Sequence, residues 1–172
     1  MAVPTTFPEP SSATSDPAAL LGRYLDFYRG ELTRGVRSLD DEGLRTSRLP
    51  SGWTPLELLA HLVHVEQRWI VWGFLGREVA EPWGDEVDGR WVVPDGVDVE
   101  SLLGRLDAGA AVTSEVLATS PLDALATPGG RWTDDLPTLS WTCFHVLQEY
   151  ARHVGHLDVA VELAGGSVGE GA

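Results

Sequence analysis

Four potential metal ligands recur at helical spacing near the C-terminal end of the sequence. They follow one another at steps of four, four and three residues: His145, Glu149, His153 and His156. Because an α-helix has about 3.6 residues per turn, these side chains lie on one side of a helix. Imidazole nitrogens and carboxylate oxygens are ligands of zinc and related divalent ions. The spacing therefore predicts a helix that presents metal ligands.

The two remaining histidines, His61 and His64, belong to a second segment with a helical pattern. Two helices that turn imidazoles and a carboxylate toward each other can enclose a divalent ion. A catalytic zinc typically has three protein ligands and one open position, and we expect His61, Glu149 and His153 to be those ligands. A dipositive ion would keep a net charge of about +1 in this set, which favours an anionic fourth ligand such as hydroxide or thiolate. The competing interpretation is that the histidines are ordinary hydrogen-bonded residues and no metal binds.

The neighbouring polar residues have expected supporting roles. Glu57 lies one turn before His61 and is expected to orient its ring, as metal-bound histidines require. His64 lies about 60° around the helix from His61, so we expect it to carry protons or to lie at the rim. His145 is expected to be a fourth ligand or a partner of Glu149. The ligand role is disfavoured, because three ligands from one helix would span too great a length for one ion. His156 is expected to be hydrogen-bonded beside the site.

Composition limits the kind of protein and its partners. The chain has 172 residues with 43% hydrophobic content, which suits one domain with a single core. Its formal net charge of -14, with no lysine, argues against nucleic-acid and anionic membrane partners. The single cysteine, Cys143, is expected to pack as a small apolar residue and cannot form an intramolecular disulfide. With neither a signal peptide nor a spanning segment recognisable, we expect a cytoplasmic protein.

Apolar periodicity and capping residues predict four long helices. The expected segments run from Asp16 to Leu39, Thr54 to Leu75, Asp98 to Thr119 and Thr138 to about Gly165. Long connections follow the second and third helices, and Trp83 and Trp91 in the first of these are expected to cover an apolar ligand or to fasten the loop. We therefore predict an all-α four-helix bundle over residues 15–166. We expect residues 1–14 to form a disordered arm and residues 167–172 a flexible tail.

Two motifs carry a resemblance to a known family. The patterns Trp53-x7-His61-Leu62 and Glu149-x3-His153-x-Gly155-His156 resemble the DinB/YfiT-like metalloenzyme superfamily. The similarity extends over residues 17–165 and is greatest to an actinobacterial branch near the mini-circle protein and the N-terminal domain of mycothiol-dependent maleylpyruvate isomerase. The resemblance implies a four-helix bundle of unusual connectivity, a divalent metal at one end, and often a homodimer.

The last helix departs from the pattern of many members, which have His-x3-His where this sequence has Glu149-x3-His153. The change resembles the maleylpyruvate isomerase branch, in which one His and a Glu-x3-His pair bind zinc. Characterised relatives use mycothiol or bacillithiol. The resemblance thus implies a metal-dependent thiol S-transferase that joins mycothiol or a similar thiol to a small electrophile, with zinc as the metal and nickel or manganese as alternatives. The other open functions are a zinc-dependent hydrolase or isomerase, and a non-catalytic metal- or thiol-binding protein.

Overall fold

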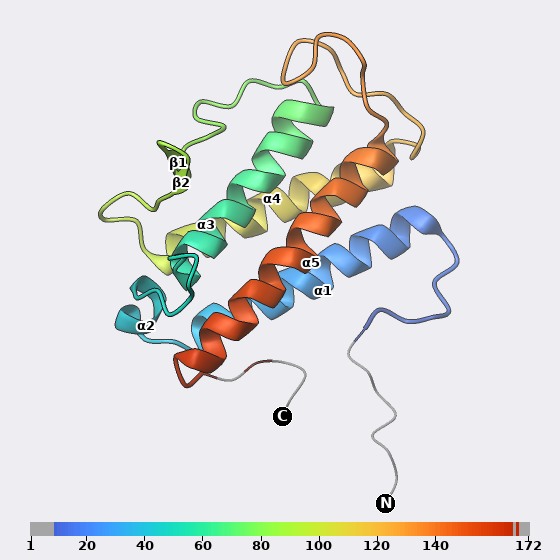
Figure 1. Cartoon of the computed structure of the whole chain (residues 1–172). Coiled ribbons are helices and arrows are strands. Elements are labelled where there is room, and N and C mark those ends of the chain that lie inside the picture. The colour runs from blue at the N-terminus through green and yellow to red at the C-terminus, as the bar shows by residue number, and fades with distance from the viewer. Residues whose placement is uncertain (1–8, 167, 169–172) are drawn as a thin grey trace, which may run out of the picture.

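The computed structural model describes residues 9–166 and 168 of the chain. About half of these residues belong to long helices, which Figure 1 shows: α1 (Pro17–Arg37), α3 (Pro55–Glu66), α4 (Val99–Thr119) and α5 (Leu139–Leu163). A π-helix, η1 (Gln67–Phe74), continues α3, and a short helix, α2 (Asp41–Arg45), precedes it. The described part of the chain is therefore all-α, as the sequence predicts.

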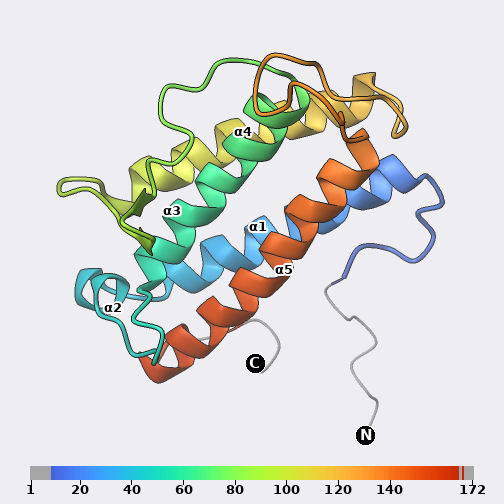
Figure 2. The same ribbon diagram turned by 45° about the horizontal axis from the view of Figure 1, so that its top comes forward.

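The long helices pack around one hydrophobic core. Helix α1 contacts α5 and α4, and α3 contacts the same two helices. Figures 1 and 2 show α3 and α5 running past each other, with α1 and α4 behind them. Every long helix contributes leucines with little or no exposed surface, among them Leu25, Leu58, Leu106 and Leu157. This packing fixes the spacing between α3 and α5, the two helices with the predicted metal ligands.

Side-chain caps begin the helices where the sequence predicts them. Asp16 accepts hydrogen bonds from Ala18 N and Ala19 N at the start of α1, and Asp98 accepts one from Ser101 N at the start of α4. At α3, Thr54 and Glu57 form a capping box. Each such cap contributes about 1 kcal/mol to helix stability. The predicted helix starts are thus confirmed on chemical grounds.

The second predicted helix differs in its last two turns. The sequence predicts one α-helix up to Leu75, but residues Gln67–Phe74 are π-helical. The wider turn is visible at its end, where Leu75 N donates to Ile70 O at 2.9 Å. Gly73 suits this geometry, since a Cβ there would lie 3.0 Å from the carbonyl oxygen of Arg68. π-Helical turns are rare and are often found at functional sites.

The connection between η1 and α4 contains a small hairpin that the sequence analysis does not predict. Its two-residue strands, β1 (Glu86–Val87) and β2 (Arg90–Trp91), pair antiparallel. The turn between them has positive φ at Asp88 (52°) and Gly89 (76°), residue types that tolerate this conformation. Helix α2 is also absent from the prediction, which places no element between the first and second long helices. In Figure 1, the hairpin and α2 both lie beside α3, on the left of the view.

One buried carboxylate links the four long helices. Glu66 of α3 accepts hydrogen bonds from Arg29 Nε of α1 (2.7 Å), Thr113 Oγ1 of α4 (2.7 Å) and Tyr150 Oη of α5 (2.6 Å). The Glu66 residue is only 1% exposed. A buried carboxylate is tolerated because it is paired with a cation and fully hydrogen-bonded.

Cys143 of α5 is fully buried in the same core, as expected from its apolar surroundings. Burial, with the nearby Glu66 charge, raises the pKa of its thiol to about 12. Among the described residues, no helix is long and apolar enough to cross a membrane. The predicted N-terminal arm falls largely, at residues 1–8, outside the described residues, as does the predicted tail except for Val168.

Candidate metal centre

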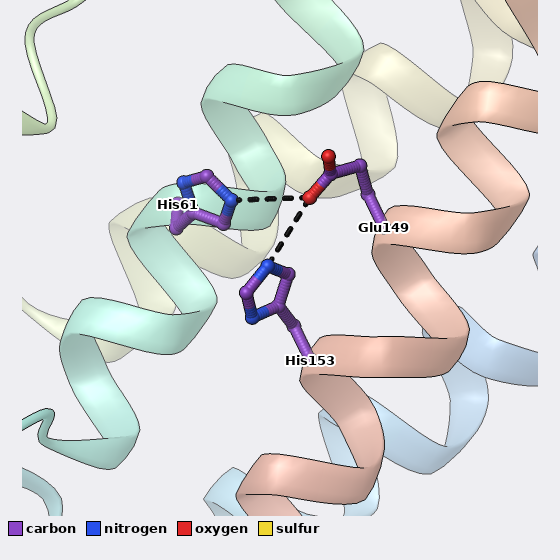
Figure 3. A group of neighbouring side chains, drawn as sticks. All are labelled: His61, Glu149 and His153. Atoms are coloured by element: carbon purple, nitrogen blue, oxygen red, sulfur yellow. Dashed lines mark hydrogen bonds and ion pairs between the residues drawn. The ribbon is translucent and has the colours of Figure 1, made fainter. Parts of the chain in front are cut away.

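Three predicted ligands converge between α3 and α5. His61 comes from α3, and Glu149 and His153 come from successive turns of α5; each offers a ligand atom, and these atoms all lie within 4.8 Å of one another. The Nε2 atoms of His61 and His153 lie 3.6 and 3.1 Å from the same carboxylate oxygen, Glu149 Oε2. Figure 3 shows both imidazoles pointing toward that oxygen. The structure thus brings together the residues that the sequence selects, and metal binding by them stays a prediction.

The donor set fits a divalent ion of the zinc type. His61 and His153 are 4% and 6% exposed, so their rings are shielded from bulk water. Within the described residues, His153 Nδ1 is buried and has no hydrogen-bond partner. Two imidazoles and one carboxylate form a common catalytic ligand set that leaves one position for a small molecule.

The close packing of the three candidate ligands changes their pKa values. Hydrogen bonds with His153 and His61 hold the pKa of Glu149 well below its usual range, despite its burial. Burial lowers the pKa of His153 and outweighs the hydrogen bond with Glu149. Burial would also lower the pKa of His61, but hydrogen bonds to Asp85 and Glu149 outweigh it, so this pKa is raised. Metal ligation needs an ionised carboxylate and neutral imidazoles, so the first two shifts assist it and the third opposes it.

Asp85 holds the ring of His61 from the opposite side. Its Oδ2 lies 3.1 Å from His61 Nδ1, and its Oδ1 accepts a hydrogen bond from Arg68 Nη1 at 2.5 Å. Arg68 in turn donates to the carbonyl oxygen of Pro82 at 3.1 Å. Burial would raise the pKa of Asp85, but the hydrogen bonds to His61 and Arg68 keep it lowered. A carboxylate on Nδ1 fixes the tautomer that leaves Nε2 free for a metal.

Sequence reasoning assigned that contact to Glu57, and the structure corrects it. The Glu57 carboxylate accepts a hydrogen bond from Thr54 N at 2.8 Å and belongs to the capping box of α3. Asp85, 24 residues from His61 along the chain, makes the contact instead. It lies in a connection with several other acidic residues, so no spacing rule distinguishes it. Burial distinguishes Asp85 from those acidic residues, but the burial of a single residue cannot be read from the sequence.

Tryptophan side chains enclose the centre. Trp53 stacks on His153 with ring centroids 5.2 Å apart, and the ring of Trp91 lies 4.0 Å from that of His61. The three candidate ligands line a cavity of about 340 Å³, with Trp53, Trp69, Trp83 and Trp91 among its other lining residues. The structure therefore places both tryptophans of the connection, Trp83 and Trp91, beside the candidate ligands. A ligand that entered here would meet largely aromatic walls.

The remaining predicted residues lie at different distances from the centre. His145 lines the same cavity, and its Nε2 lies 3.2 Å from Glu149 Oε1, the oxygen that faces away from the other two imidazoles. The ring of His156 is 6.0 Å from that of Trp53. His64 lines a separate cavity, and its Nδ1 donates to Ala60 O at 2.9 Å. The predicted proton-carrying role of His64 thus has no contact with the centre to support it.

Comparison with known proteins identifies the family of the chain. A model of the mycothiol S-transferase family matches residues 20–166. No curated protein and no solved structure matches the chain. A mostly helical protein with a His/His/Glu cluster between two helices is consistent with the DinB-like superfamily, and the family match places the chain there. Within that superfamily, the chain belongs to the mycothiol S-transferase family, which confirms the resemblance seen in the sequence.

Proposed function

We propose that the protein is a metal-dependent S-transferase that joins mycothiol, or a similar low-molecular-weight thiol, to a small electrophile. The single observation that supports the metal is the convergence of His61, Glu149 and His153 on one point. Membership of the mycothiol S-transferase family supports the thiol. We further propose zinc as the native ion, with nickel and manganese as alternatives, since the nitrogen and oxygen donors suit all three.

The chain's own residues prepare the reaction. When bound, a divalent ion would supply a Lewis acid that favours the thiolate form of a thiol at neutral pH. Asp85 keeps the proton of His61 on Nδ1, which leaves the lone pair of Nε2 for a metal. The tryptophan walls of the cavity offer aromatic surface to the apolar body of an electrophile.

Transfer forms a sulfur–carbon bond and releases the thiol proton together with any leaving group of the electrophile. Of the polar residues that the sequence places near the ligands, His145 lines the cavity, whereas His64 and Glu57 do not. Burial, despite the Glu149 charge, lowers the pKa of His145, so its imidazole is neutral and able to accept a proton near pH 7. We therefore assign the proton-accepting role to His145 rather than to His64 or Glu57.

The finer fold and the partners are part of the same proposal. The contacts of α1 and α3 with both α4 and α5 support a four-helix bundle of the DinB/YfiT type. We propose that the protein acts on small molecules in the cytoplasm, with neither nucleic acid nor membrane as partner, and that it forms a homodimer. The charge of -14 supports the absence of nucleic acid.

A transfer assay tests the proposal directly. Protein purified without a His-tag is analysed for its metal, then mixed with mycothiol and monochlorobimane, a fluorogenic electrophile. We expect metal in stoichiometric amount and transfer faster than the uncatalysed reaction. His61→Ala should abolish both, whereas His156→Ala, which alters an exposed histidine outside the cavity, is the matched control. Equal rates for the wild type and His61→Ala would refute the proposal.

Other outcomes of the same assay would favour the alternatives. Turnover of esters, amides or isomerisable substrates without any thiol would indicate a hydrolase or isomerase, with a metal-bound water as nucleophile. Binding of mycothiol without turnover across a panel of electrophiles would indicate a binding protein.

A further inference from the structure

A second cavity lies between α3, α4 and the connection that joins η1 to α4. Its volume is about 450 Å³, and no residue of its lining also lines the cavity of the metal centre. The two cavities meet the connection at adjacent residues, because Trp83 lines the cavity of the metal centre and Gly84 lines the second cavity. Small-molecule sites in proteins typically have volumes of about 300–1,000 Å³, so this cavity is large enough for an organic ligand.

Most of the wall of this cavity is apolar. The connection contributes aliphatic side chains from both of its arms, and α4 contributes Leu102; the aliphatic lining residues of the connection are Val79, Ala80, Val92, Val93 and Val97. Each methylene group that a ligand buries against such a wall contributes about 0.8 kcal/mol. The wall thus favours a ligand with an apolar body.

The opposite wall presents an arginine with unused hydrogen-bond donors. Arg105 Nη2 lies 3.1 Å from His64 Nε2 and 3.4 Å from Gln67 Oε1. His64 donates through Nδ1 to Ala60 O, so its Nε2 is the acceptor for Arg105. Over residues 9–166 and 168, the structure shows no ion pair between Arg105 and a carboxylate. A guanidinium group has five N–H donors in a planar fork, and most of those of Arg105 remain for a ligand.

The charges around the cavity favour a singly charged anion. Arg105 is the cationic residue of the lining, and Glu81, which is exposed, is the acidic one. A phosphate dianion would bring two negative charges toward one arginine and one glutamate. A carboxylate brings one, and its two oxygens match the guanidinium fork.

We propose that this cavity is a second ligand site, which binds a small organic carboxylate with its acid group at Arg105 and its apolar body against the valines of the connection. The proposal does not depend on the transferase activity, since it concerns residues outside the metal centre. Binding here and transfer there can therefore succeed or fail separately.

Defined probes test the proposal on the full-length protein as purified. Hexanoate and benzoate are titrated by calorimetry beside their neutral amides, hexanamide and benzamide, and beside inorganic phosphate. We expect each carboxylate to bind at least tenfold more tightly than its amide and than phosphate, since a tenfold ratio corresponds to about 1.4 kcal/mol. Methyl NMR spectra of the wild type should show shifts at Val93 and Leu102, which locates the ligand without any variant.

Matched variants then assign the charge. Arg105→Gln should weaken carboxylate binding at least tenfold. Arg105→Lys keeps the charge but not the planar fork of donors, so its carboxylate affinity should lie between those of the wild type and Arg105→Gln. Arg77→Gln removes an equal charge from an exposed position of the same connection, outside both cavities, and should bind like the wild type. His61→Ala should also retain binding, because it alters only the metal centre.

Several results would overturn the proposal. One is the absence of saturation by either carboxylate at about 10 mM, where even millimolar affinity would be visible. Another is equal affinity in the wild type and in Arg105→Gln. Loss of binding in His61→Ala with retention in Arg105→Gln would locate the carboxylate at the metal centre, and tighter binding of phosphate than of both carboxylates would contradict the stated ligand class.

Discussion

The choice of nitrogen on each imidazole decides whether His61 and His153 can act together. Asp85 lies at Nδ1 of His61, and both Nε2 atoms lie at Glu149 Oε2. A helical spacing can place two rings on facing sides, but it cannot choose the nitrogen. For His61 that choice comes from a residue of a loop, which makes the Asp85 contact the most informative single interaction of the site.

Asp85→Asn tests this contact at the level of one residue. The amide is uncharged and binds Arg68 more weakly, so His61 should lose its fixed orientation and part of its basicity. We expect metal affinity to fall by about 10–100-fold, measured by competition with a chromophoric chelator. Asp88→Asn is the control, because Asp88 lies at the exposed turn of the hairpin that follows Asp85. It should leave the metal affinity unchanged.

The pH dependence of metal binding follows from the direction of each pKa shift. His61 has a pKa raised above its usual 6.5, whereas those of His153 and Glu149 are lowered. As the pH falls toward the raised pKa of His61, its proton competes with the metal first, while His153 remains neutral and Glu149 ionised. Affinity should therefore begin to decrease above pH 6.5, with release of about one proton per metal bound. Calorimetry in buffers of different ionisation enthalpy measures the number of protons released. If no proton were released near pH 6.5, the raised pKa of His61 would be contradicted.

At the scale of elements, the Glu66 network holds the helices that carry the ligands. Glu66→Gln removes the buried countercharge of Arg29, which stays paired with Asp26 at the surface; removal of one partner of a buried pair costs about 3–5 kcal/mol. We expect a loss of that size in the free energy of unfolding, measured by urea denaturation. Asp26→Asn is the matched control, because Asp26 binds the same arginine with a side chain that is 64% exposed, and exposed pairs contribute at most about 1 kcal/mol. Equal losses in the two variants would show that burial does not govern the pair.

The sequence predicts the long helices well because their starts are local. Thr54 with Glu57, and Asp16 before Pro17, are capping patterns contained within four residues. Likewise, the positions of His61, Glu149 and His153 follow from helical period and from the resemblance together.

The parts that sequence reasoning missed depend on distant contacts. The π-helical stretch carries Trp72 and Phe74, whose carbonyl oxygens accept hydrogen bonds from Arg131 N and Thr127 N of the later connection. Those partners are more than fifty residues away, so no local pattern distinguishes Gln67–Phe74 from an α-helix. The Asp85–His61 contact has the same origin. The sequence favours Glu57 as the residue that orients the His61 ring, because a spacing of one helical turn is a local pattern.

For the molecule as a whole, a metal at this centre would join α3 to α5. An ion that binds the folded chain and not the unfolded one stabilises it by about 2.7 kcal/mol at a concentration one hundred times its dissociation constant. Removal of metal with a chelator should therefore lower the melting temperature, and zinc should restore it. Glu149→Gln, which removes the charged ligand, should show a much smaller difference between the two conditions. An identical melting temperature with and without metal in the wild type would contradict a site that bridges the two helices.

Cys143 gives the whole protein a form of chemical self-protection. A catalyst that brings sulfur and electrophiles together risks alkylation of its own sulfur, which requires the thiolate form and access to the reagent. Cys143 has neither, being fully buried with a pKa of about 12. Iodoacetamide should leave the native chain unmodified and label one site after denaturation, as intact mass spectrometry would show. Under the proposed function, the protein would meet reactive compounds repeatedly without being consumed by them, and labelling of the folded protein would show that Cys143 is not protected in this way.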